Sequence, residues 1–162
     1  MSFKEILGQE KTISILQNAL MSSRLSHAYL FAGPTGCGKV FTAINFAKAI
    51  NCLERPDSLH DSCGQCVCCK KIDSGNHIDV RRVSLLKGKS EILIDQIKQI
   101  QQQINLRPYE AKYKVFCISD ADLMNEESQN ALLKTLEEPP VKSIIILTTS
   151  KPHGLLPTVI SR

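Results

Sequence analysis

The sequence has 162 residues and a net charge of +4 at pH 7, with 43% hydrophobic and 22% charged residues. These values are typical of one soluble globular domain that is long enough to bury a core, and the mildly basic charge is compatible with nucleic acid nearby. No apolar run reaches the length of a membrane-spanning helix, and residues 1–10 are too polar for a signal peptide, which predicts a cytoplasmic protein with no membrane partner.

Strands and helices alternate in the pattern of apolar residues. In chain order, the patterns predict a helix over residues 9–22, a strand over 28–32, a helix over 40–50, a strand over 78–83, a helix over 91–104, a strand over 114–118, a helix that Asn125 caps and that Pro139 and Pro140 end, and a strand over 143–147. Strands that alternate with helices form parallel sheets. The sequence therefore predicts an α/β domain whose parallel sheet is flanked by helices.

A glycine-rich stretch joins the first predicted strand to its helix. It reads Gly33-Pro34-Thr35-Gly36-Cys37-Gly38-Lys39-Val40. The glycines let successive backbone N–H groups converge on one point, where the helix N-terminus and the lysine side chain add positive charge. Strand, glycine-rich turn and helix are the context of a phosphate-binding P-loop, so these eight residues are predicted to bind the phosphates of ATP.

Two positions depart from the pattern of an ATP-hydrolysing P-loop protein. A serine or threonine after the lysine normally ligates Mg²⁺, but Val40 has no oxygen to offer. An acidic residue normally follows a later buried strand, but the residue after the strand 114–118 is Ser119. Asp120 comes one place later, either as a surviving acid of the site or, as we prefer, as a solvated loop residue. ATP and Mg²⁺ are therefore expected to bind weakly or not at all.

The cysteines point to a metal site. Five of the seven lie between residues 52 and 69, and in a cytosolic chain such a group indicates metal binding rather than disulfides. The tidiest ligand set for one structural zinc ion is Cys52, Cys63, Cys66 and Cys69. Cys68 could replace Cys69, and His60 could replace Cys52. Residues 51–70 are thus predicted to be a zinc-binding insert, and four protein ligands would leave no open position for a substrate.

The stretch Asn130-Ala131-Leu132-Leu133-Lys134-Thr135-Leu136-Glu137-Glu138-Pro139-Pro140 resembles the signature of bacterial DNA polymerase III clamp-loader subunits. Supporting matches are Gly8-Gln9-Glu10, His27-Ala28-Tyr29-Leu30-Phe31, the cysteine insert and Ser161-Arg162. The resemblance implies an AAA+ nucleotide-binding base domain over residues 1–162, with the family's lid and collar domains absent from this chain. It also implies a hetero-pentamer with gamma/tau and delta subunits that loads the sliding clamp on primer-template DNA, within a DNA-directed DNA polymerase (nucleotidyltransferase) holoenzyme.

Two kinds of subunit in this family share these features. The gamma/tau subunits are ATPase motors with a hydroxyl after the P-loop lysine and an Asp-Glu pair after the strand, whereas the delta-prime subunit has an eroded site. This sequence departs from the motor pattern at Val40, Ser119 and Asp120. The resemblance therefore favours a delta-prime-like subunit without ATPase activity of its own. The alternative is an ATP-hydrolysing gamma/tau motor, and the long signature disfavours a zinc-containing nucleotide-binding protein outside replication.

The resemblance also assigns roles to residues near the end of the sequence. Arg162 would be an arginine finger, offered across a subunit boundary to the phosphates of a neighbour. Without the resemblance, Arg162 would be taken for a surface arginine. Thr148 or Thr149 would match the nucleotide-sensing position, and Thr149 is our choice for the site.

Overall fold

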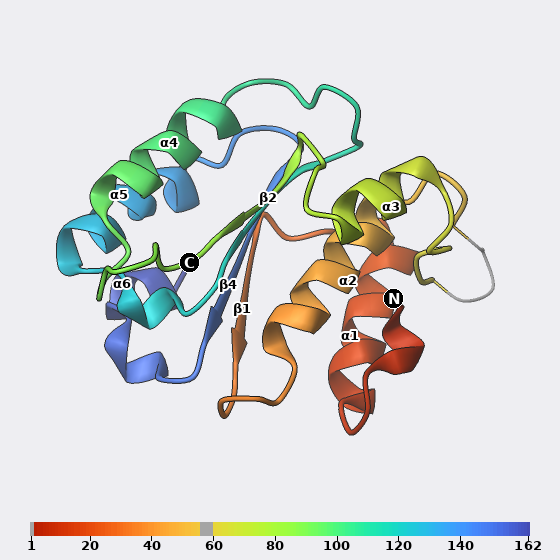
Figure 1. The fold of residues 1–162 in the computed structure, drawn as a ribbon, viewed down its shortest axis with the longest axis horizontal. Coiled ribbons are helices and arrows are strands. Elements are labelled where there is room, and N and C mark those ends of the chain that lie inside the picture. The colour runs from red at the N-terminus through yellow and green to blue at the C-terminus, as the bar shows by residue number, and fades with distance from the viewer. Residues whose placement is uncertain (1, 56–59) are drawn as a thin grey trace.

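The computed structural model describes residues 2–55 and 60–162; residue 1 of the predicted domain and residues 56–59 of the predicted insert lie outside these ranges. Within them the sheet contains, in spatial order, β1 (Ala28–Ala32), β4 (Ser143–Thr149), β3 (Lys114–Ile118) and β2 (Val80–Val83), and all neighbouring strands are parallel. One face of the sheet is covered by α1 (Glu10–Met21), α2 (Lys39–Asn51) and α3 (Val67–Asp73), and the other by α4 (Ile94–Ile104), α5 (Glu126–Glu137) and α6 (Pro157–Ile160) (Figure 1). The predicted fold class, a parallel sheet flanked by helices, is confirmed.

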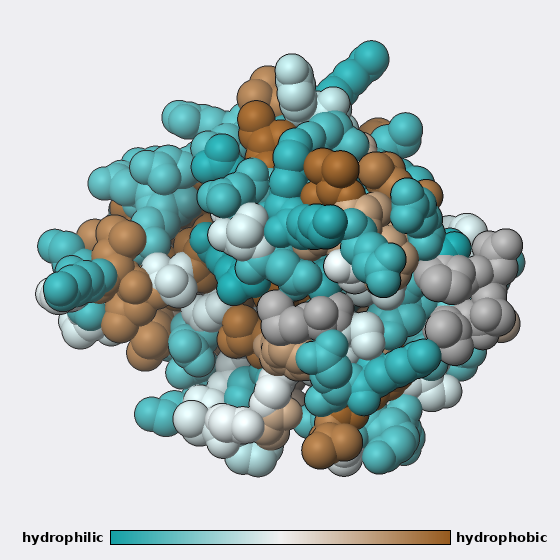
Figure 2. All heavy atoms as spheres, turned by 45° about the vertical axis from the view of Figure 1, so that its right-hand side comes forward, coloured by the Kyte–Doolittle hydropathy of each residue, from teal (hydrophilic) through white to brown (hydrophobic). Residues whose placement is uncertain are grey.

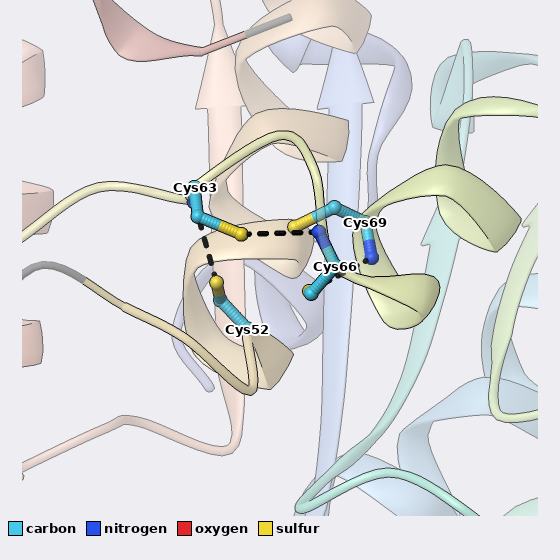
Figure 3. A group of neighbouring side chains, drawn as sticks. All are labelled: Cys52, Cys63, Cys66 and Cys69. Carbon is cyan, nitrogen blue, oxygen red and sulfur yellow. Dashed lines mark hydrogen bonds between the residues drawn. The ribbon is translucent and has the colours of Figure 1, made fainter.

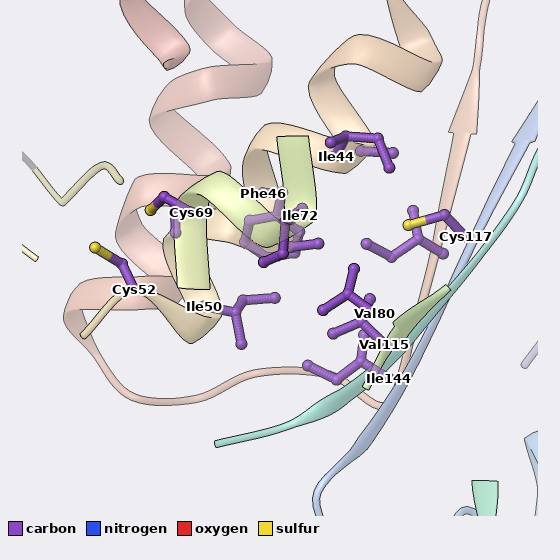
Figure 4. Close-up of a cluster of buried hydrophobic side chains, with 14 of the residues drawn as sticks. Ile44, Phe46, Ile50, Cys52, Cys69, Ile72, Val80, Val115, Cys117 and Ile144 are labelled. Carbon is purple, nitrogen blue, oxygen red and sulfur yellow. The ribbon is translucent and has the colours of Figure 1, made fainter. Parts of the chain in front are cut away.

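The two central strands connect two hydrophobic cores. Every residue of β3 and β4 is buried, which explains why both read as continuous apolar runs. Successive side chains point to opposite faces, so Val115 and Cys117 pack with α1, α2 and α3, while Phe116 and Ile118 pack with α4, α5 and α6. Figure 4 shows the first of these cores, where Phe46 and Ile50 of α2 lie against the sheet.

Helix α2 is fixed at its C-terminal end, far along the chain from the segments that hold it. The Asn51 side chain donates to the backbone oxygen of Tyr113 at 3.0 Å and accepts from the Tyr113 nitrogen at 2.9 Å. Lys48 is fully buried and pairs with Asp73 at the end of α3 at 2.8 Å. Residues 33–38 alone join β1 to α2, so the N-terminus of α2 lies at the carboxyl end of β1, the edge where parallel sheets bind ligands.

Several element bounds differ from the prediction. Strand β2 begins at Val80 rather than at residue 78, because Ile78 is half exposed although it is apolar. Helix α4 begins at Ile94, and β4 continues past the predicted residue 147 to Thr149. Helix α3 was not predicted and runs to Asp73, beyond the predicted end of the insert at residue 70. Its seven residues are too few for a clear hydrophobic period, and it is held by the sulfur cluster described below.

The surface agrees with the composition. Figure 2 turns the side with α1, α2 and α3 forward, and there hydrophilic residues predominate while hydrophobic ones form separate patches. Among the helices of the described residues, none combines the length and the hydrophobicity that crossing a membrane requires.

Candidate nucleotide and metal sites

The P-loop between β1 and α2 adopts a conformation that depends on its glycines. Gly36 and Gly38 have φ of 82° and 84°, in the left-handed region that residues with a Cβ rarely adopt. Gly38 is also the N-cap of α2, so the loop runs directly into the helix. At Cys37 the backbone oxygen accepts a hydrogen bond from Gln9 Nε2 at 2.9 Å. The predicted strand, turn and helix are therefore present, with the loop supported from the start of α1.

Lys39 turns back into the loop that precedes it. Its Nζ donates to the backbone oxygens of Gly33 at 2.8 Å and Pro34 at 2.7 Å. The ammonium group thus lies beside the N-terminus of α2, which carries its own partial positive charge. Positive charge is concentrated at the carboxyl end of β1, as an anion-binding loop requires, and a bound phosphate would compete with the two carbonyls for the ammonium group.

Asp120 and the P-loop share one cleft although 80 residues separate them. The cleft has a volume of about 280 Å³ and is lined by Thr35, Gly36, Gly38, Lys39, Val40, Phe41 and Asp120. Asp120 is the only acid among these lining residues, and Val40 places an apolar side chain where the P-loop motif has a hydroxyl. Asp120 is exposed, as our preferred interpretation expected, but it faces the candidate phosphate site. Ser119 is mostly buried, and its backbone nitrogen donates to the backbone oxygen of Val83.

The backbone at Asp120 is held in an unusual conformation. Its φ of 50° and ψ of 53° lie in the left-handed region, which aspartate tolerates better than most residues. The Asp120 backbone nitrogen donates to Thr148 Oγ1 at 3.3 Å, so β4 fixes the turn that carries the carboxylate. The carboxyl ends of β3 and β4 thereby position this acid at the cleft.

Thr149 is fully buried, and its hydroxyl is bonded to residues that do not line that cleft. Thr149 Oγ1 donates to the carboxylate of Asp122 and accepts from the backbone nitrogen of Lys151 at 3.0 Å. Neither Thr148 nor Thr149 is among the residues that line the cleft. The nucleotide-sensing role of Thr149 stays a prediction.

Arg162 lies apart from the P-loop of its own chain. It follows α6, and its Nη2 donates to Glu137 Oε1 of α5 at 2.9 Å, with both side chains about half exposed. Figure 1 shows the C-terminus on the side of the sheet that α5 and α6 cover, whereas α2 covers the other side. This location is compatible with a residue that would act on another subunit, and the finger role stays a prediction.

The four cysteines chosen from the sequence lie together. The sulfur atoms of Cys52, Cys63, Cys66 and Cys69 are all within 4.8 Å of one another (Figure 3). Cys52 follows the end of α2, Cys63 lies in the connecting loop, and Cys66 is the N-cap of α3. In a tetrahedral zinc–thiolate site, bonds of about 2.3 Å place the sulfurs roughly 3.8 Å apart. The donor set therefore fits a zinc ion, and small movements of the side chains would complete the tetrahedron.

Backbone groups donate hydrogen bonds to the sulfurs of this cluster and favour the thiolate form of Cys66. The backbone nitrogens of Cys63 and Cys66 donate to Cys52 Sγ and Cys63 Sγ, each at 3.3 Å, and that of Cys69 donates to Cys66 Sγ at 3.5 Å. Burial opposes ionisation of Cys66, yet hydrogen bonds from the backbone of Cys69 and Leu53 lower its pKa to about 6. Burial raises the pKa of Cys52 and Cys69. A metal ion would displace the protons of these thiols, because the thiolate is the ligand.

Cys68 and His60, the two alternative metal ligands considered from the sequence, lie outside the sulfur cluster. Cys68 Sγ is 3.4 Å from His77 Nε2, and both residues are buried. Burial raises the pKa of Cys68 to about 12, so the thiol is neutral. His77 Nδ1 accepts from the Asp79 backbone nitrogen at 3.1 Å, which leaves the proton of the neutral imidazole on Nε2, facing the Cys68 sulfur. Neither Cys68 nor His60 belongs to the sulfur cluster.

Asp79 is a buried residue that sequence reasoning missed. Its carboxylate accepts hydrogen bonds from the backbone nitrogens of Tyr109, Glu110 and Ala111 at 2.9, 2.7 and 3.0 Å, and Lys114 Nζ lies 3.8 Å away. Burial raises the pKa of Asp79, but the three N–H donors outweigh it and hold the pKa below its ordinary value. The donors are 30 or more residues away in the chain, so no local sequence pattern predicts the contact.

We expect Asp79→Asn to lower the free energy of unfolding by about 2–3 kcal/mol at pH 7, because the amide nitrogen cannot accept the N–H groups that the carboxylate accepts. Since the folded pKa is depressed, this stability is fully present above the ordinary pKa of about 3.9 and is lost as the pH falls through the folded pKa. Urea unfolding of both proteins at pH 7 and pH 3 measures the difference. Asp95→Asn, at an exposed carboxylate, is the control, and an equal loss at both pH values would contradict the expectation.

Comparisons with known proteins agree with this fold and these motifs. Residues 8–162 match the family described as "DNA polymerase III, delta subunit". The chain is 41% identical over 160 residues to DNA polymerase III subunit tau of Bacillus subtilis, and 39% identical over 154 residues to DNA polymerase III subunit delta' of the same organism. These alignments cover 99% and 95% of this chain but only 28% and 45% of the two relatives. A solved structure of a DNA polymerase III gamma subunit-related protein from Thermotoga maritima superposes with a TM-score of 0.67 at 23% identity, over 93% of this chain and 43% of that one, which shows the fold alone.

Proposed function

Since the chain belongs to the DNA polymerase III delta subunit family of AAA+ clamp-loader proteins, we propose that it is a delta-prime-like subunit that helps to assemble the ATP-driven complex without hydrolysing ATP. The overall similarity does not separate the subunit types, because identity to tau is 41% and identity to delta' is 39%. Two residues support the choice, Val40 in the lining of the cleft and Ser119 next to Asp120 in the chain. Val40 stands at the position of the magnesium-binding hydroxyl, and Ser119 at that of the first acid.

The chemistry of magnesium explains why these two positions matter. Mg²⁺ takes oxygen ligands in near-octahedral geometry, and it neutralises the charge that develops on the transferred phosphate. Among the residues that line the cleft, Asp120 alone supplies a carboxylate. Val40 has no side-chain oxygen where the motif normally has a hydroxyl. Losing two metal contacts removes several kcal/mol of transition-state stabilisation, which is enough to abolish useful turnover. Nucleotide would then be bound weakly or not at all.

The proposed partners follow from the family. The subunit would join gamma/tau and delta subunits in a hetero-pentamer and would reach the sliding clamp and primer-template DNA through that assembly. Arg162 would be offered to the phosphates of a neighbouring subunit, and its half-exposed guanidinium on the α6 side of the sheet supports this role. Zn²⁺ at Cys52, Cys63, Cys66 and Cys69 would be structural, since four thiolates close its coordination.

One observation favours the alternative, an ATP-hydrolysing gamma/tau motor. Asp120 faces the same cleft as Lys39, so its carboxylate could hold a magnesium-bound water in place of the missing ligands. In that case the chain would bind ATP more tightly with magnesium than without it, and it would hydrolyse ATP.

Calorimetric titration of ATP into this chain, with and without magnesium, tests the proposal. We expect no magnesium dependence for the unaltered chain. The double variant Val40→Thr, Ser119→Asp should gain at least about tenfold in affinity with magnesium, or about 1.4 kcal/mol, because it places oxygen groups at the two positions where the motif carries its magnesium ligands. The matched control is Val40→Ala, which shortens the apolar side chain without adding an oxygen. Tight magnesium-dependent binding by the unaltered chain, together with hydrolysis, would establish the motor alternative instead.

A further inference from the structure

A buried carboxylate of the insert holds the first residues of the chain. The backbone nitrogen of Phe3 donates to Asp61 Oδ2 at 3.0 Å, and that of Ser62 donates to Asp61 Oδ1 at 2.6 Å. Asp61 is 3% exposed and Phe3 is 2% exposed. A buried carboxylate that loses its N–H donors is costly, so this contact determines where Phe3 lies.

The residues around Phe3 form one small folded unit. Phe3 begins the short 3₁₀ helix η1 (Phe3–Glu5), in which Ser2 Oγ accepts from the Lys4 nitrogen at 3.3 Å and Glu5 Oε1 accepts from the Ser2 nitrogen at 2.9 Å. The Phe3 ring belongs to the core that also contains Cys52 and Cys69. Figure 1 shows this N-terminal segment beside α2 and the insert. Residues 2–6 thus dock as a unit against the insert and against α2.

The same segment leads to the P-loop within a few residues. Gln9 is the N-cap of α1, and its Nε2 donates to the Cys37 backbone oxygen at 2.9 Å. Gln9 also lines a cavity of about 160 Å³ together with Cys37 and Lys39. Only residues 7 and 8 separate Gln9 from the docked unit 2–6. A displacement of that unit would therefore move the side chain that supports the P-loop.

Asp61 also lies close along the chain to the sulfur cluster. Asp61 lies two residues before Cys63, whose backbone nitrogen donates to Cys52 Sγ at 3.3 Å. Figure 3 shows this hydrogen bond between Cys63 and Cys52, which follows the end of α2. A cation bonded to both sulfurs would tie residues 61–63 to α2 far more strongly than this N–H to sulfur hydrogen bond does.

We propose that Asp61 is a positioning residue that links the metal insert to the nucleotide site. Metal loading holds Asp61 in place, Asp61 holds residues 2–6, and Gln9 then supports the P-loop backbone at Cys37. By thermodynamic linkage, an anion bound at the P-loop and a metal bound at the cysteines each raise the affinity of the other. This inference rests on the proposed function only for the identity of the P-loop ligand, and the exchange measurements below need no nucleotide.

Hydrogen–deuterium exchange of the whole chain tests the link, before and after a chelator has removed bound zinc. Removal should speed exchange of the amides in residues 3–9 about tenfold and should also speed exchange in residues 33–44, which include the first turn of α2. Asp61→Ala should speed exchange at residues 3–9 in the same way while the metal is still bound. The absorption of cobalt(II) at the four thiolates would show that the metal site of this variant is intact.

Three further variants separate the link from general destabilisation. Asp79→Ala removes an equally buried carboxylate and should speed exchange at residues 109–111 but not at 3–9. Gln9→Ala should speed exchange at 33–44 and leave residues 3–6 protected. Asp61→Asn keeps one acceptor oxygen and should restore part of the protection, and it serves as the test if Asp61→Ala fails to fold.

Unchanged exchange at residues 3–9 in an Asp61 variant with an intact cobalt spectrum would overturn the proposal, as would unchanged exchange at 33–44 in Gln9→Ala. Tight magnesium-dependent nucleotide binding would overturn the proposed function and would leave the exchange results, and so this link, unaffected.

Discussion

Replacement of Arg162 by alanine is expected to lower the ATPase rate of the assembled clamp loader by about 10³-fold at the one site that this residue would complete. A guanidinium placed on the transferring phosphate stabilises charge that grows in the transition state, so its loss should reduce kcat more than nucleotide binding. In the structure Arg162 is paired only on the surface, with Glu137 at 2.9 Å, and both side chains are about half exposed. A phosphate on a neighbouring subunit could replace Glu137 with little loss of free energy, because exposed ion pairs contribute little.

The measurement is single-turnover ATP hydrolysis by the complex reassembled with each variant of this subunit. Arg162→Lys keeps the charge but loses the planar fork of donors, and it should recover only a small part of the rate. Glu137→Ala frees Arg162 without removing it and should leave the rate unchanged. Arg24→Ala, at an exposed arginine elsewhere, is the matched control. An unchanged rate with Arg162→Ala would show that Arg162 is a surface arginine.

Removal of metal from the four-cysteine cluster is expected to lower the free energy of unfolding by at least about 3 kcal/mol. The metal would join the end of α2 to the insert and to α3, and without it four largely buried thiols are held by weak N–H to sulfur hydrogen bonds. Thermal unfolding before and after chelation measures the effect, with metal analysis to confirm removal. Because protons compete with the metal for the thiolates, metal affinity should also fall as the pH falls.

Two cysteine variants make this test specific. Cys69→Ser should lose the bound metal and most of the stabilisation, whereas Cys68→Ser should still bind one zinc ion and lose only the contact with His77. The two cysteines are adjacent, buried and on the same short helix, so general effects of the substitution are matched. Equal metal content in both variants would contradict the predicted ligand set, and an unchanged melting temperature after confirmed removal would contradict a structural role.

Elements whose signals are local could be predicted from the residues alone. Strand β3 was predicted with its observed ends, because a central parallel strand is apolar along its whole length. Asn125 was predicted to cap α5, and its side chain accepts from the Ser128 nitrogen at 2.9 Å. The P-loop and the cysteine spacing are short patterns too, and the long signature of residues 130–140 identified the family that the comparison confirmed.

Contacts between residues far apart in the sequence became visible only in the folded chain. Asp120 faces the P-loop cleft, Asp61 holds Phe3, and Cys68 contacts His77 rather than the sulfur cluster. Phe3 donates to Asp61 and residues 109–111 donate to Asp79, and these donors are far along the chain, so the contacts depend on how separate parts of the fold pack together. Periodicity and spacing report on neighbours along the chain, whereas these contacts arise from the packing of separate elements. The family and the motifs could thus be read from the sequence, and the connection between the metal cluster and the nucleotide site could not.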